Sequence, residues 1–451
     1  MMREAARHLL PQPPSVALEG RRVLVLGLGD TGLSVARYAE RRGALVRVAD
    51  TRVAAPRRDE LQGDLRFGRF TPALLTDVDL VCISPGLSLA EPLVGEALSR
   101  GIPLLGDIEL FAWENRAPVL AVTGTNGKST VTALTGHLLR SAGIDCEVAG
   151  NISPPVLDAL MARAMPPAAW ALELSSYQLE TTWTLNAVAA TMLNLSEDHL
   201  DRYGGLADYG AAKARIFRGD GIQVLNRDDA ASTAMALRGR RVVTFGLDAP
   251  PSARDFGFSA GALLEGPHRL IEARALATHG AHNIANALAA CALARAAGVP
   301  REALRPALAA FRGLPHRVEL VARRAGVDWY DDSKGTNVGA TIAALRGLGK
   351  RAVLILGGDG KGQDFKPLRM PVAQFASHVL LIGRDAPLIE AALGGFAAER
   401  CATLEQAVAR AASLARPGEA VLLSPACASF DMFRDYKERG ERFAAAARAL
   451  P

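Results

Sequence analysis

Short apolar runs recur along the chain, and most are followed by a turn and then by a stretch with helical spacing. In the first quarter the apolar runs cover 22–26, 44–49 and 79–84, and the first of them precedes a helical stretch over 33–42. Apolar runs of this length are typical of buried parallel strands, and their alternation with helices indicates a doubly wound sheet. The pattern predicts an α/β unit in this part of the chain.

The same order of strand, glycine-rich loop and helix occurs twice more. A strand over 118–122 is followed by a helix over 131–142, and a long alanine-rich helix is predicted over 283–297. Further strands are predicted at 168–174, 187–193, 221–226, 241–245, 327–330, 352–356, 378–382 and 420–423. Strand and helix patterns lapse into turn residues near Asp107 and at 312–315. We therefore predict three domains, covering 1–107, 108–313 and 314–451.

Composition supports a folded enzyme-sized chain. The chain has 451 residues, of which 49% are hydrophobic and 22% charged, a profile that excludes disorder and low-complexity repeats. Its net charge of +5 comes from scattered arginines and favours anionic small molecules. No lysine or arginine block of the nucleic-acid-binding type is present, so we expect no nucleic-acid partner.

Cysteine usage and the amino-terminal segment indicate the compartment. Five cysteines without C-x-x-C spacing support neither a disulfide framework nor a zinc knuckle, and fit a reducing environment. The first 15 residues are charged and lack the apolar core of a secretory signal. No uncharged apolar run approaches the roughly 18 residues that span a bilayer. We expect a soluble cytoplasmic protein without a membrane partner.

A G-x-G-x-x-G motif follows the first strand. Its glycines are Gly27, Gly29 and Gly32, and Asp50 stands 18 positions after the last of them. Such glycines let a diphosphate approach a helix N-terminus, while the acidic residue accepts a hydrogen bond from a ribose hydroxyl. Taken alone the motif suggests NAD, although a turn of this kind can also serve only to pack a helix on a sheet. The motif indicates a nucleotide diphosphate without specifying the base.

A second glycine-rich loop, Gly124 to Thr130, has the Gly-Lys-Ser ending of a P-loop. Backbone N–H groups of such a loop surround phosphates, Lys128 adds a positive charge, and the Ser129 hydroxyl is a Mg²⁺ ligand. Val122 stands where the general pattern has its first glycine. The position of the loop between a strand and a helix predicts an ATP site.

Several polar groups between this loop and residue 220 are candidates for phosphate chemistry. Glu173 ends an apolar strand, where a carboxylate is costly unless it faces a metal or a cation, so it is a candidate Mg²⁺ ligand. An acidic segment over 194–203 contains His199, and Lys213 follows among small residues. On its own, Lys213 is better explained as an ordinary surface lysine, and a solvated loop is an alternative interpretation of the acidic segment.

Taken together, these motifs resemble those of the Mur ligase family, and the resemblance extends over nearly the whole chain. The family motifs are the loop at 123–130, Glu173, the segment 194–203, and a third group of His282, Asn283, Asn286 and Arg317. Segments 332–337, 356–362 and 424–431 resemble the branch of the family that adds D-glutamate. Gly335, Tyr177 and Tyr436 depart from residues common in the family.

The resemblance implies an α/β fold in three domains. These are a Rossmann-like UDP-binding domain, a P-loop ATPase-like central domain and a Rossmann-like C-terminal domain. It further implies cytoplasmic peptidoglycan precursor synthesis, in which an ATP-dependent ligase adds D-glutamate to UDP-N-acetylmuramoyl-L-alanine through an acyl phosphate. ATP, two Mg²⁺ ions and a CO₂-derived carbamate on Lys213 are the implied cofactors, and a monomer is the implied state.

The resemblance also assigns roles to individual residues. It implies catalytic roles for Lys128, Glu173, His199, Lys213 and Lys334. It implies ATP contacts from Gly124, Thr125, Asn126, Gly127, Lys128, Ser129, Thr130, Asn283, Asn286, Arg317 and Asp332. The implied UDP-substrate contacts are Asp30, Thr31, Asp50, Thr51, Arg52, Gly86 and Asn151, and the implied glutamate contacts are Thr336, Lys361, Ser429 and Tyr436. The implied metal ligands are Ser129, Glu173, His199 and the carbamate of Lys213.

Four alternatives remain at this point: a ligase that adds L-glutamate, a folylpolyglutamate-synthase-like ligase, an NAD-dependent oxidoreductase and a non-catalytic nucleotide-binding regulator. A folylpolyglutamate-synthase-like ligase should lack the N-terminal Gly27 to Arg52 unit. The oxidoreductase and the regulator leave Lys128, Glu173 and Lys213 unexplained. The residues alone do not show which enantiomer of glutamate is used.

Overall fold

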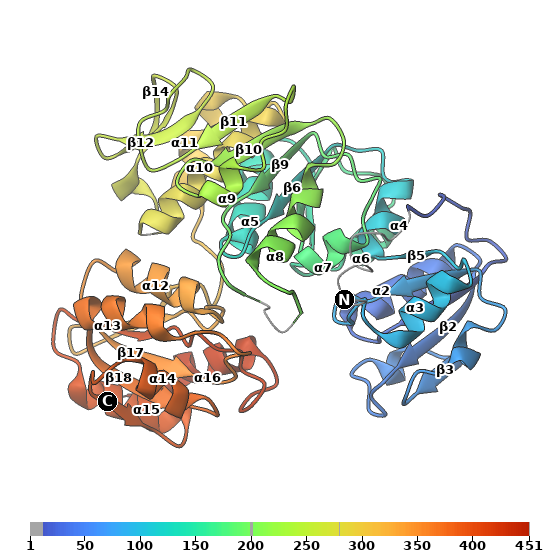
Figure 1. Cartoon of the computed structure of the whole chain (residues 1–451). Helices are drawn as coiled ribbons and strands as arrows, with labels where there is room; N and C mark the ends of the chain where they lie inside the picture. Colours follow the sequence, from blue (N-terminus) through green and yellow to red (C-terminus); the bar gives the residue numbers. More distant parts are fainter. Residues whose placement is uncertain (1–11, 199–201, 279, 451) are drawn as a thin grey trace.

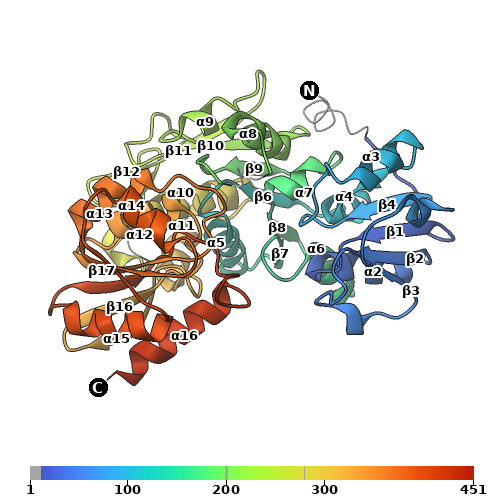
Figure 2. The ribbon, with the colours of Figure 1, turned by 60° about the horizontal axis from the view of Figure 1, so that its bottom comes forward.

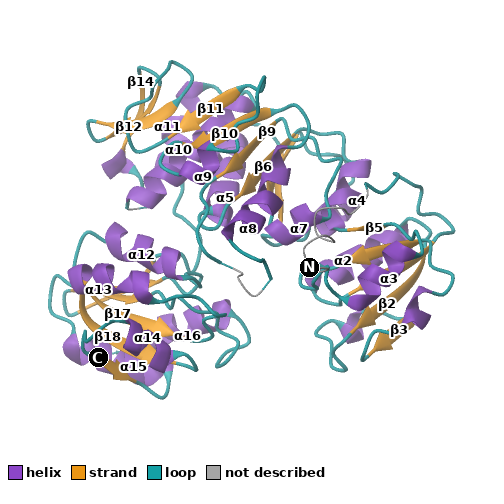
Figure 3. Ribbon diagram, viewed as in Figure 1, coloured by secondary structure: helices purple, strands orange, loops and turns teal. Residues whose placement is uncertain are grey.

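Three sheets follow one another along the chain in the computed structural model, which describes residues 12–198, 202–278 and 280–450. Figures 1 and 2 show the central unit, coloured cyan to yellow, between the blue N-terminal unit and the orange to red C-terminal unit. Helices cover both faces of the sheets (Figure 3). This is the α/β architecture expected from the alternation of apolar runs and helices.

The N-terminal sheet is parallel, with the strand order β3-β2-β1-β4-β5. Its strands are β1 (Arg22–Leu26), β2 (Leu45–Asp50), β3 (Asp64–Phe67), β4 (Leu80–Ile83) and β5 (Leu104–Leu105). The helices are α2 (Asp30–Arg41), α3 (Pro92–Ser99) and α4 (Asp107–Glu114), with 3₁₀ turns η1 (Arg58–Glu60) and η2 (Pro72–Leu75). Because the order reverses beside β1, the carboxyl ends of β1 and β4 form the crevice in which ligands of such sheets bind.

The central sheet has the order β14-β13-β12-β11-β10-β9-β6-β8-β7. Its strands are β6 (Val119–Thr123), β7 (Cys146–Gly150), β8 (Ala169–Glu173), β9 (Ala189–Met192), β10 (Ile222–Asn226), β11 (Val242–Phe245), β12 (Phe256–Ser259), β13 (Ala262–Glu265) and β14 (His268–Glu272). β12, β13 and β14 pair antiparallel, and the other pairs are parallel.

Helices pack against both faces of this sheet. One buried cluster joins β6 to α5 (Lys128–Ser141), α10 (Ala281–Ala296) and α11 (Arg301–Ala310). The other joins the opposite face to α4, to α6 (Val156–Ala162) and to α2 of the N-terminal unit. The remaining elements are α7 (Ser176–Glu180), α8 (Leu206–Ala214), α9 (Ala230–Thr233), η3 (Arg215–Phe217) and η4 (Ala273–Ala275). A continuous apolar cluster thus connects the N-terminal and central units.

The C-terminal sheet has the order β15-β16-β20-β17-β18-β19, and only its β15–β16 pair is antiparallel. Its strands are β15 (Glu319–Arg324), β16 (Val327–Asp331), β17 (Ala352–Gly357), β18 (Ala376–Ile382), β19 (Ala398–Arg400) and β20 (Ala420–Leu423). One face packs against α12 (Val338–Gly347), η5 (Lys366–Leu368), α13 (Arg369–Phe375) and α14 (Ala386–Ala392). The other packs against α15 (Leu404–Leu414) and α16 (Tyr436–Ala449).

Several expected elements differ from the structure in extent. α2 begins at Asp30 and α5 at Lys128, whereas the spacing of apolar residues predicted helices that begin at residues 33 and 131. Both helices begin directly at a glycine-rich loop, whose polar residues hide the helical pattern of the first turn. β3, β5, β7, β12 to β15 and β19 were not predicted, because each has six residues or fewer, and all but β5 contain polar, charged or glycine positions that interrupt the apolar run. Among the described residues, no helix has the length and apolar character needed to cross a bilayer.

Candidate active site

The loop at the end of β6 has the conformation of a phosphate-binding loop. Gly127, the residue before α5, has φ of +85°, and a Cβ there would lie 2.5 Å from the Asn286 side-chain oxygen. Only glycine fits this combination of left-handed backbone and close neighbour. The loop is tied to the adjacent strand end, because Thr125 N donates to Asn194 O at 2.9 Å and Asn126 N to Asn194 Oδ1 at 2.8 Å. The N-terminus of α5 is therefore presented as an anion site.

Lys128 is the first residue of α5 and folds back over the loop. Its Nζ donates to Thr125 O at 2.9 Å. Burial lowers the pKa of Lys128 below its usual value, and the nearby carboxylates of Glu173 and Asp198 oppose that shift. Among the described residues, the hydrogen-bond partner of Lys128 is thus a neutral carbonyl, which an incoming phosphate oxygen would outcompete.

Glu173, at the end of β8, has one oxygen without a partner. Its side chain is buried, Oε1 accepts from Asn151 Nδ2 at 2.7 Å, and the buried Oε2 has no hydrogen-bond partner among the described residues. A buried carboxylate oxygen without a donor is costly, and a hard cation such as Mg²⁺ is a ligand that would satisfy it. The position therefore fits the metal role that the sequence predicts.

Lys213 is buried rather than exposed, in contrast to the usual place of a lysine. Its Nζ donates to Gly124 O at 2.8 Å and lies 4.5 Å from the centre of the Tyr209 ring. Burial lowers the pKa of Lys213 well below its usual value, and the positive charge of Lys128 lowers it further. Such an amine is nucleophilic because its nitrogen keeps its lone pair near neutral pH.

These groups face one cavity of about 250 Å³ between the central and C-terminal units. Its lining includes Lys128, Glu173 and Lys213 from the central unit, and Lys334, Thr336 and Lys361 from the C-terminal unit. Four of the five predicted catalytic residues therefore meet at one place. The fifth, His199, lies outside the described residues.

A neighbouring cavity of about 380 Å³ extends along the start of α10. Asn283, Asn286, Arg317 and Asp332 line it together with the P-loop residues Asn126, Gly127 and Thr130. Burial raises the pKa of Asp332 to about 7, and a hydrogen bond from Ser424 Oγ at 2.7 Å opposes this shift. The cavity joins the phosphate loop to amide side chains, as a site for an adenine nucleoside requires.

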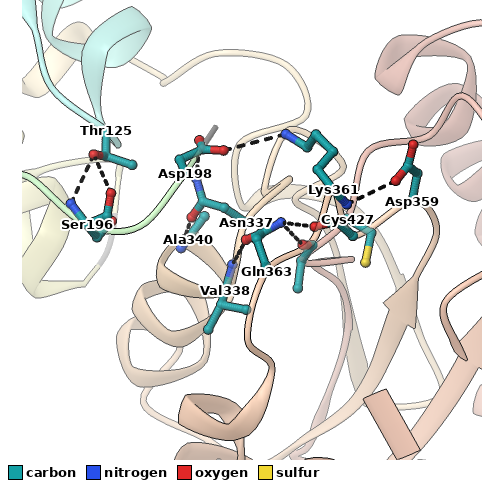
Figure 4. Close-up of polar contacts among 12 residues, drawn as sticks. Thr125, Ser196, Asp198, Asn337, Val338, Ala340, Asp359, Lys361, Gln363 and Cys427 are labelled. Atoms are coloured by element: carbon teal, nitrogen blue, oxygen red, sulfur yellow. Dashed lines mark hydrogen bonds and ion pairs between the residues drawn. The ribbon is translucent and has the colours of Figure 1, made fainter. Parts of the chain in front are cut away.

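Residues of the C-terminal unit reach directly into the phosphate loop. Arg317 Nη2 donates to Ser129 Oγ at 2.6 Å. Asn337 donates to Asn126 Oδ1 at 3.1 Å and to Asp198 Oδ2 at 3.2 Å, and Lys361 Nζ lies 3.6 Å from Asp198 Oδ1. Figure 4 shows Lys361 extended toward Asp198, with Asn337 on the same side. The two units are therefore already in contact across the site.

A third cavity, of about 700 Å³, lies at the carboxyl ends of β1 and β4. All seven predicted UDP-substrate residues line it: Asp30, Thr31, Asp50, Thr51, Arg52, Gly86 and Asn151. Lys334 and Tyr436 approach it from the C-terminal unit, and Lys334 lines all three cavities. Burial and the nearby Arg317 lower the pKa of Lys334 to about 8.

The Asp50 carboxylate is fully engaged within the protein. It accepts from Leu28 N at 2.7 Å, and from the Arg52 backbone and guanidinium at 2.7 to 2.9 Å. Burial would raise the pKa of Asp50, but these hydrogen bonds outweigh it and lower the pKa to about 2. Asp50 therefore orients Arg52, a cation at the rim of the nucleotide crevice, as well as lining the crevice itself.

The four predicted glutamate residues are divided between two cavities. Thr336 and Lys361 line the 250 Å³ cavity, whereas Tyr436 lines the 700 Å³ cavity. Ser429 is buried, and it is absent from the described lining of all three cavities. Gly124 and Ser129 of the phosphate loop are also buried, and they too are absent from the described lining of the three cavities.

Sequence reasoning missed several lining residues. Asp198, Tyr209 and Asn337 line the 250 Å³ cavity, and Gln178 and Lys437 line the 700 Å³ cavity. Asp198 and Asn337 belong to motifs that were recognised, so their place in those motifs was the available indication. Lys437 lies one residue after Tyr436 in the first turn of α16, a helix whose pattern carries no sign of a ligand.

One acidic group has metal-like spacing away from the predicted ligands. The side chains of His316, Glu319 and Asp331 approach within 4.8 Å of one another. His316 Nδ1 is 2.6 Å from Asp331 Oδ2, and Glu319 accepts from the His316 backbone at 3.0 Å. Hydrogen bonding to Asp331 raises the pKa of His316 against the effect of burial. The three residues thus satisfy one another's hydrogen bonds, and the segment that they hold in place includes Arg317.

Comparison with known proteins agrees with this geometry. Three family models match, and they cover most of the chain: a Mur ligase MurD-like N-terminal domain at 21–106, a Mur ligase middle domain at 122–294 and a Mur ligase glutamate ligase domain at 316–427. These models and the relatives define an ATP-dependent ligase. The chain belongs to the Mur ligase family.

Relatives point to one branch of that family. The chain is 54% identical to UDP-N-acetylmuramoylalanine–D-glutamate ligase of Nitrosospira multiformis, covering 96% of both chains. It is 55% identical to the ligase of the same name from Thiobacillus denitrificans, covering 97% of this chain and 98% of the relative. Among solved structures, UDP-N-acetylmuramate-alanine ligase of Thermotoga maritima matches with a TM-score of 0.62 at 20% identity, covering 95% of this chain and 99% of that one.

Proposed function

We propose that this chain joins the amino group of D-glutamate to the L-alanine carboxylate of UDP-N-acetylmuramoyl-L-alanine, with cleavage of ATP to ADP and phosphate. The observation that carries this proposal is the meeting of three cavities at Lys334. A nucleotide-sugar crevice, an adenine-nucleotide site and an amino-acid site must open onto one another for such a reaction. Relatives of the same name at 54 and 55% identity support the substrate assignment.

The reaction begins with attack of an alanine carboxylate oxygen on the γ-phosphorus of ATP. A C–O–P linkage forms, the bond from the γ-phosphorus to the β–γ bridging oxygen breaks, and ADP leaves. Two anions must approach one another in this step. Lys128 and Lys334, which line the same 250 Å³ cavity, supply positive charge where the negative charges meet.

The second step is attack of the glutamate amine on the acyl phosphate carbonyl. A C–N bond forms, the tetrahedral centre collapses with loss of phosphate, and the nitrogen gives up a proton. Water would hydrolyse the acyl phosphate, so the cavity must be closed. Contacts from Arg317 and Asn337 to the phosphate loop bring the C-terminal unit over the site.

We propose that Glu173 and Ser129 hold Mg²⁺ in this site. The unpartnered Oε2 of Glu173 fits a cation, whereas the Ser129 hydroxyl first has to lose the hydrogen bond from Arg317. When bound, Mg²⁺ neutralises phosphate charge and polarises the phosphoryl group. A second ion, held by His199 and modified Lys213, remains part of the proposal.

For Lys213 we propose a carbamate. Its neutral nitrogen attacks the carbon of CO₂, a C–N bond forms while the electron pair of one C=O bond moves to oxygen, and the nitrogen releases one proton, so that the neutral amine becomes an anionic carbamate. The lowered pKa of Lys213 and its burial support this chemistry, because only an unprotonated amine reacts with CO₂.

Amino-acid binding is assigned to Thr336, Lys361, Ser429 and Tyr436. Glutamate carries two carboxylates, which need a cation and hydroxyl or amide donors. Lys361 Nζ is 3.6 Å from Asp198, a long and weak ion pair that leaves the ammonium available for a substrate carboxylate. We also propose domain boundaries near 107 and 313 and a monomeric state. We further propose a cytoplasmic location, and the five free cysteines support this location because thiols stay reduced in the cytoplasm.

The proposal is tested by phosphate release with ATP, UDP-N-acetylmuramoyl-L-alanine and either enantiomer of glutamate. We expect release with D-glutamate and at most a few per cent of that rate with L-glutamate. Equal use of L-glutamate would overturn the stereochemical assignment, and phosphate release that needs no amino acid would indicate an ATPase. Titration with UDP and NADH separates the two interpretations of the N-terminal crevice, with UDP expected to bind.

A further inference from the structure

Arg439, in the second turn of α16, is completely buried, and within the described part of the chain its hydrogen-bond partners are neutral oxygens rather than carboxylates. Its Nε donates to Ser333 Oγ at 2.9 Å, and its Nη2 donates to Ser333 O at 2.8 Å and Cys427 O at 3.1 Å. Its Nη1 donates to Ala428 O at 3.4 Å. Burying a guanidinium against neutral oxygens is unfavourable unless its N–H groups are well satisfied, so a fold that keeps one there uses it to fix those acceptors.

The first acceptor, Ser333, connects Arg439 to two of the proposed glutamate contacts. Ser333 precedes Lys334 and lies three residues before Thr336. Its hydroxyl accepts from Arg439 and donates to Tyr436 O at 2.8 Å. The loop after β16 and the first turn of α16 are therefore held together by the same side chain.

The other acceptors connect Arg439 to Ser429 and Lys361, the remaining two proposed glutamate contacts. Ala428 precedes Ser429, and the Ala428 carbonyl that accepts from Arg439 also accepts from Asp359 N at 3.0 Å. Ala428 N returns a hydrogen bond to Asp359 O at 2.8 Å. The Asp359 carboxylate in turn accepts from the backbone N of Lys361 at 3.0 Å, a contact visible in Figure 4.

We propose that Arg439 is the positioning residue of the amino-acid site, holding the segments that carry Thr336, Lys361, Ser429 and Tyr436 in register through one guanidinium. This inference rests on the proposed glutamate contacts. Arg439 is absent from the described lining of the three cavities, so it acts through other groups and contacts no substrate.

The chemistry of the contact explains why arginine is required. A guanidinium presents donors in a rigid planar fork, and here three of its nitrogens serve four oxygens on two separate loops. A lysine ammonium keeps the charge but concentrates its donors at one atom, which cannot reach Ser333 and Ala428 together. Arg439→Lys therefore removes the geometric link while preserving the charge.

The test compares Arg439→Lys with Arg442→Lys in the full-length enzyme. Arg442 is one turn further along the same helix, exposed, and paired with Glu405 at 2.7 Å. We expect Arg439→Lys to raise the KM for D-glutamate by about tenfold or more, while the KM values for ATP and UDP-N-acetylmuramoyl-L-alanine stay within about threefold. Single-turnover ADP formation without glutamate should persist, and Arg442→Lys should match the parent.

A second variant keeps the test decisive if Arg439→Lys does not fold. Ser333→Ala removes the Nε acceptor and the link to Tyr436, and should raise the same KM by a smaller factor. The double variant should show less than the product of the two effects, because both act on one network. An unchanged KM for D-glutamate in folded variants, or an equal rise in all three KM values, would overturn the inference. Failure of the proposed function is distinguishable, since the parent enzyme itself would then not use D-glutamate.

Discussion

Lys213 differs from an ordinary lysine in its surroundings rather than in its sequence context. Its side chain is buried, it donates to the Gly124 carbonyl, and it faces the cavity that also contains Lys128 and Glu173. Two lysines in one cavity repel each other, which is one cause of the lowered pKa of Lys213. A carbamate would replace this repulsion by attraction, so the present geometry is well suited to the modified side chain.

Removal of the Lys213 amine should therefore abolish turnover. We expect Lys213→Ala to lose at least about 99% of the activity, since it loses the carbamate that would hold the second Mg²⁺ beside the transferred phosphate. Small carboxylates such as formate should restore part of the activity, and Lys213→Arg should stay inactive because it remains cationic. With ¹³CO₂, the parent should show a carbamate signal by NMR that Lys213→Arg lacks. Full activity of Lys213→Ala would contradict the assignment.

At the scale of single residues, the sequence predicted which side chains belong to the site, but it did not predict how deeply they are buried or what they contact. Lys128, Glu173 and Lys213 were singled out from motifs, and the structure places all three at one cavity. That Lys213 is buried and that Arg317 reaches Ser129 could not be predicted from local pattern, because both depend on contacts between segments far apart in the chain. Arg439 was not noticed for the same reason.

Among the elements, the turn from β6 into α5 requires glycine at one position that borders the nucleoside cavity. Gly127 has φ of +85°, and its Cα hydrogen faces the Asn286 side chain of α10. A methyl group there must displace Asn286, which lines the nucleoside cavity. Replacing Gly127 by alanine would therefore both strain the backbone and disturb a proposed contact to the nucleotide.

Gly127→Ala should raise the KM for ATP by about tenfold or more, while leaving affinity for the UDP substrate nearly unchanged. Its matched control is Gly143→Ala at the end of α5, where φ is +80° and a Cβ would meet no heavy atom within 4 Å. Both variants should be destabilised by about 1 kcal/mol from the left-handed backbone. Thermal unfolding measures that shared cost, and steady-state kinetics isolates the effect at the nucleotide. Equal KM values for ATP in the two variants would show that the Asn286 contact is unimportant.

Regular elements were predictable where periodicity was strong. Buried strands such as β6, β17 and β20 were expected because their residues are uniformly apolar. The antiparallel extension β12 to β14 was not, because its strands have four or five residues, include polar positions and are separated by tight turns at Gly261 and Gly266. Their pairing depends on the sheet edge that β11 offers, which is tertiary information.

On the scale of the whole molecule, the central unit contacts its two neighbours in different ways. An apolar cluster joins it to the N-terminal unit through α2, α4 and α6. Its active-site contacts with the C-terminal unit include polar ones, from Arg317 to Ser129, from Asn337 to Asn126 and from Lys361 to Asp198. Polar contacts exchange with water and substrate at little cost, whereas buried apolar contacts do not. We therefore expect the C-terminal unit to be the one that moves.

Arg317 provides the most direct test of that expectation. It donates to Ser129 Oγ at 2.6 Å across the boundary between the units, and it also lines the nucleoside cavity. Arg317→Ala should weaken ATP binding by roughly tenfold to a hundredfold, the usual range of about 1.5 to 3 kcal/mol for a hydrogen bond to a charged group. The variant should also fail to compact on addition of an ATP analogue, measured as the radius of gyration in solution scattering. Binding of the UDP substrate, whose seven proposed contacts all lie in the N-terminal and central units, should change by less than about threefold. If Arg317→Ala compacts as the parent does, with unchanged affinity for ATP, then Arg317 does not couple the nucleotide to the position of the C-terminal unit.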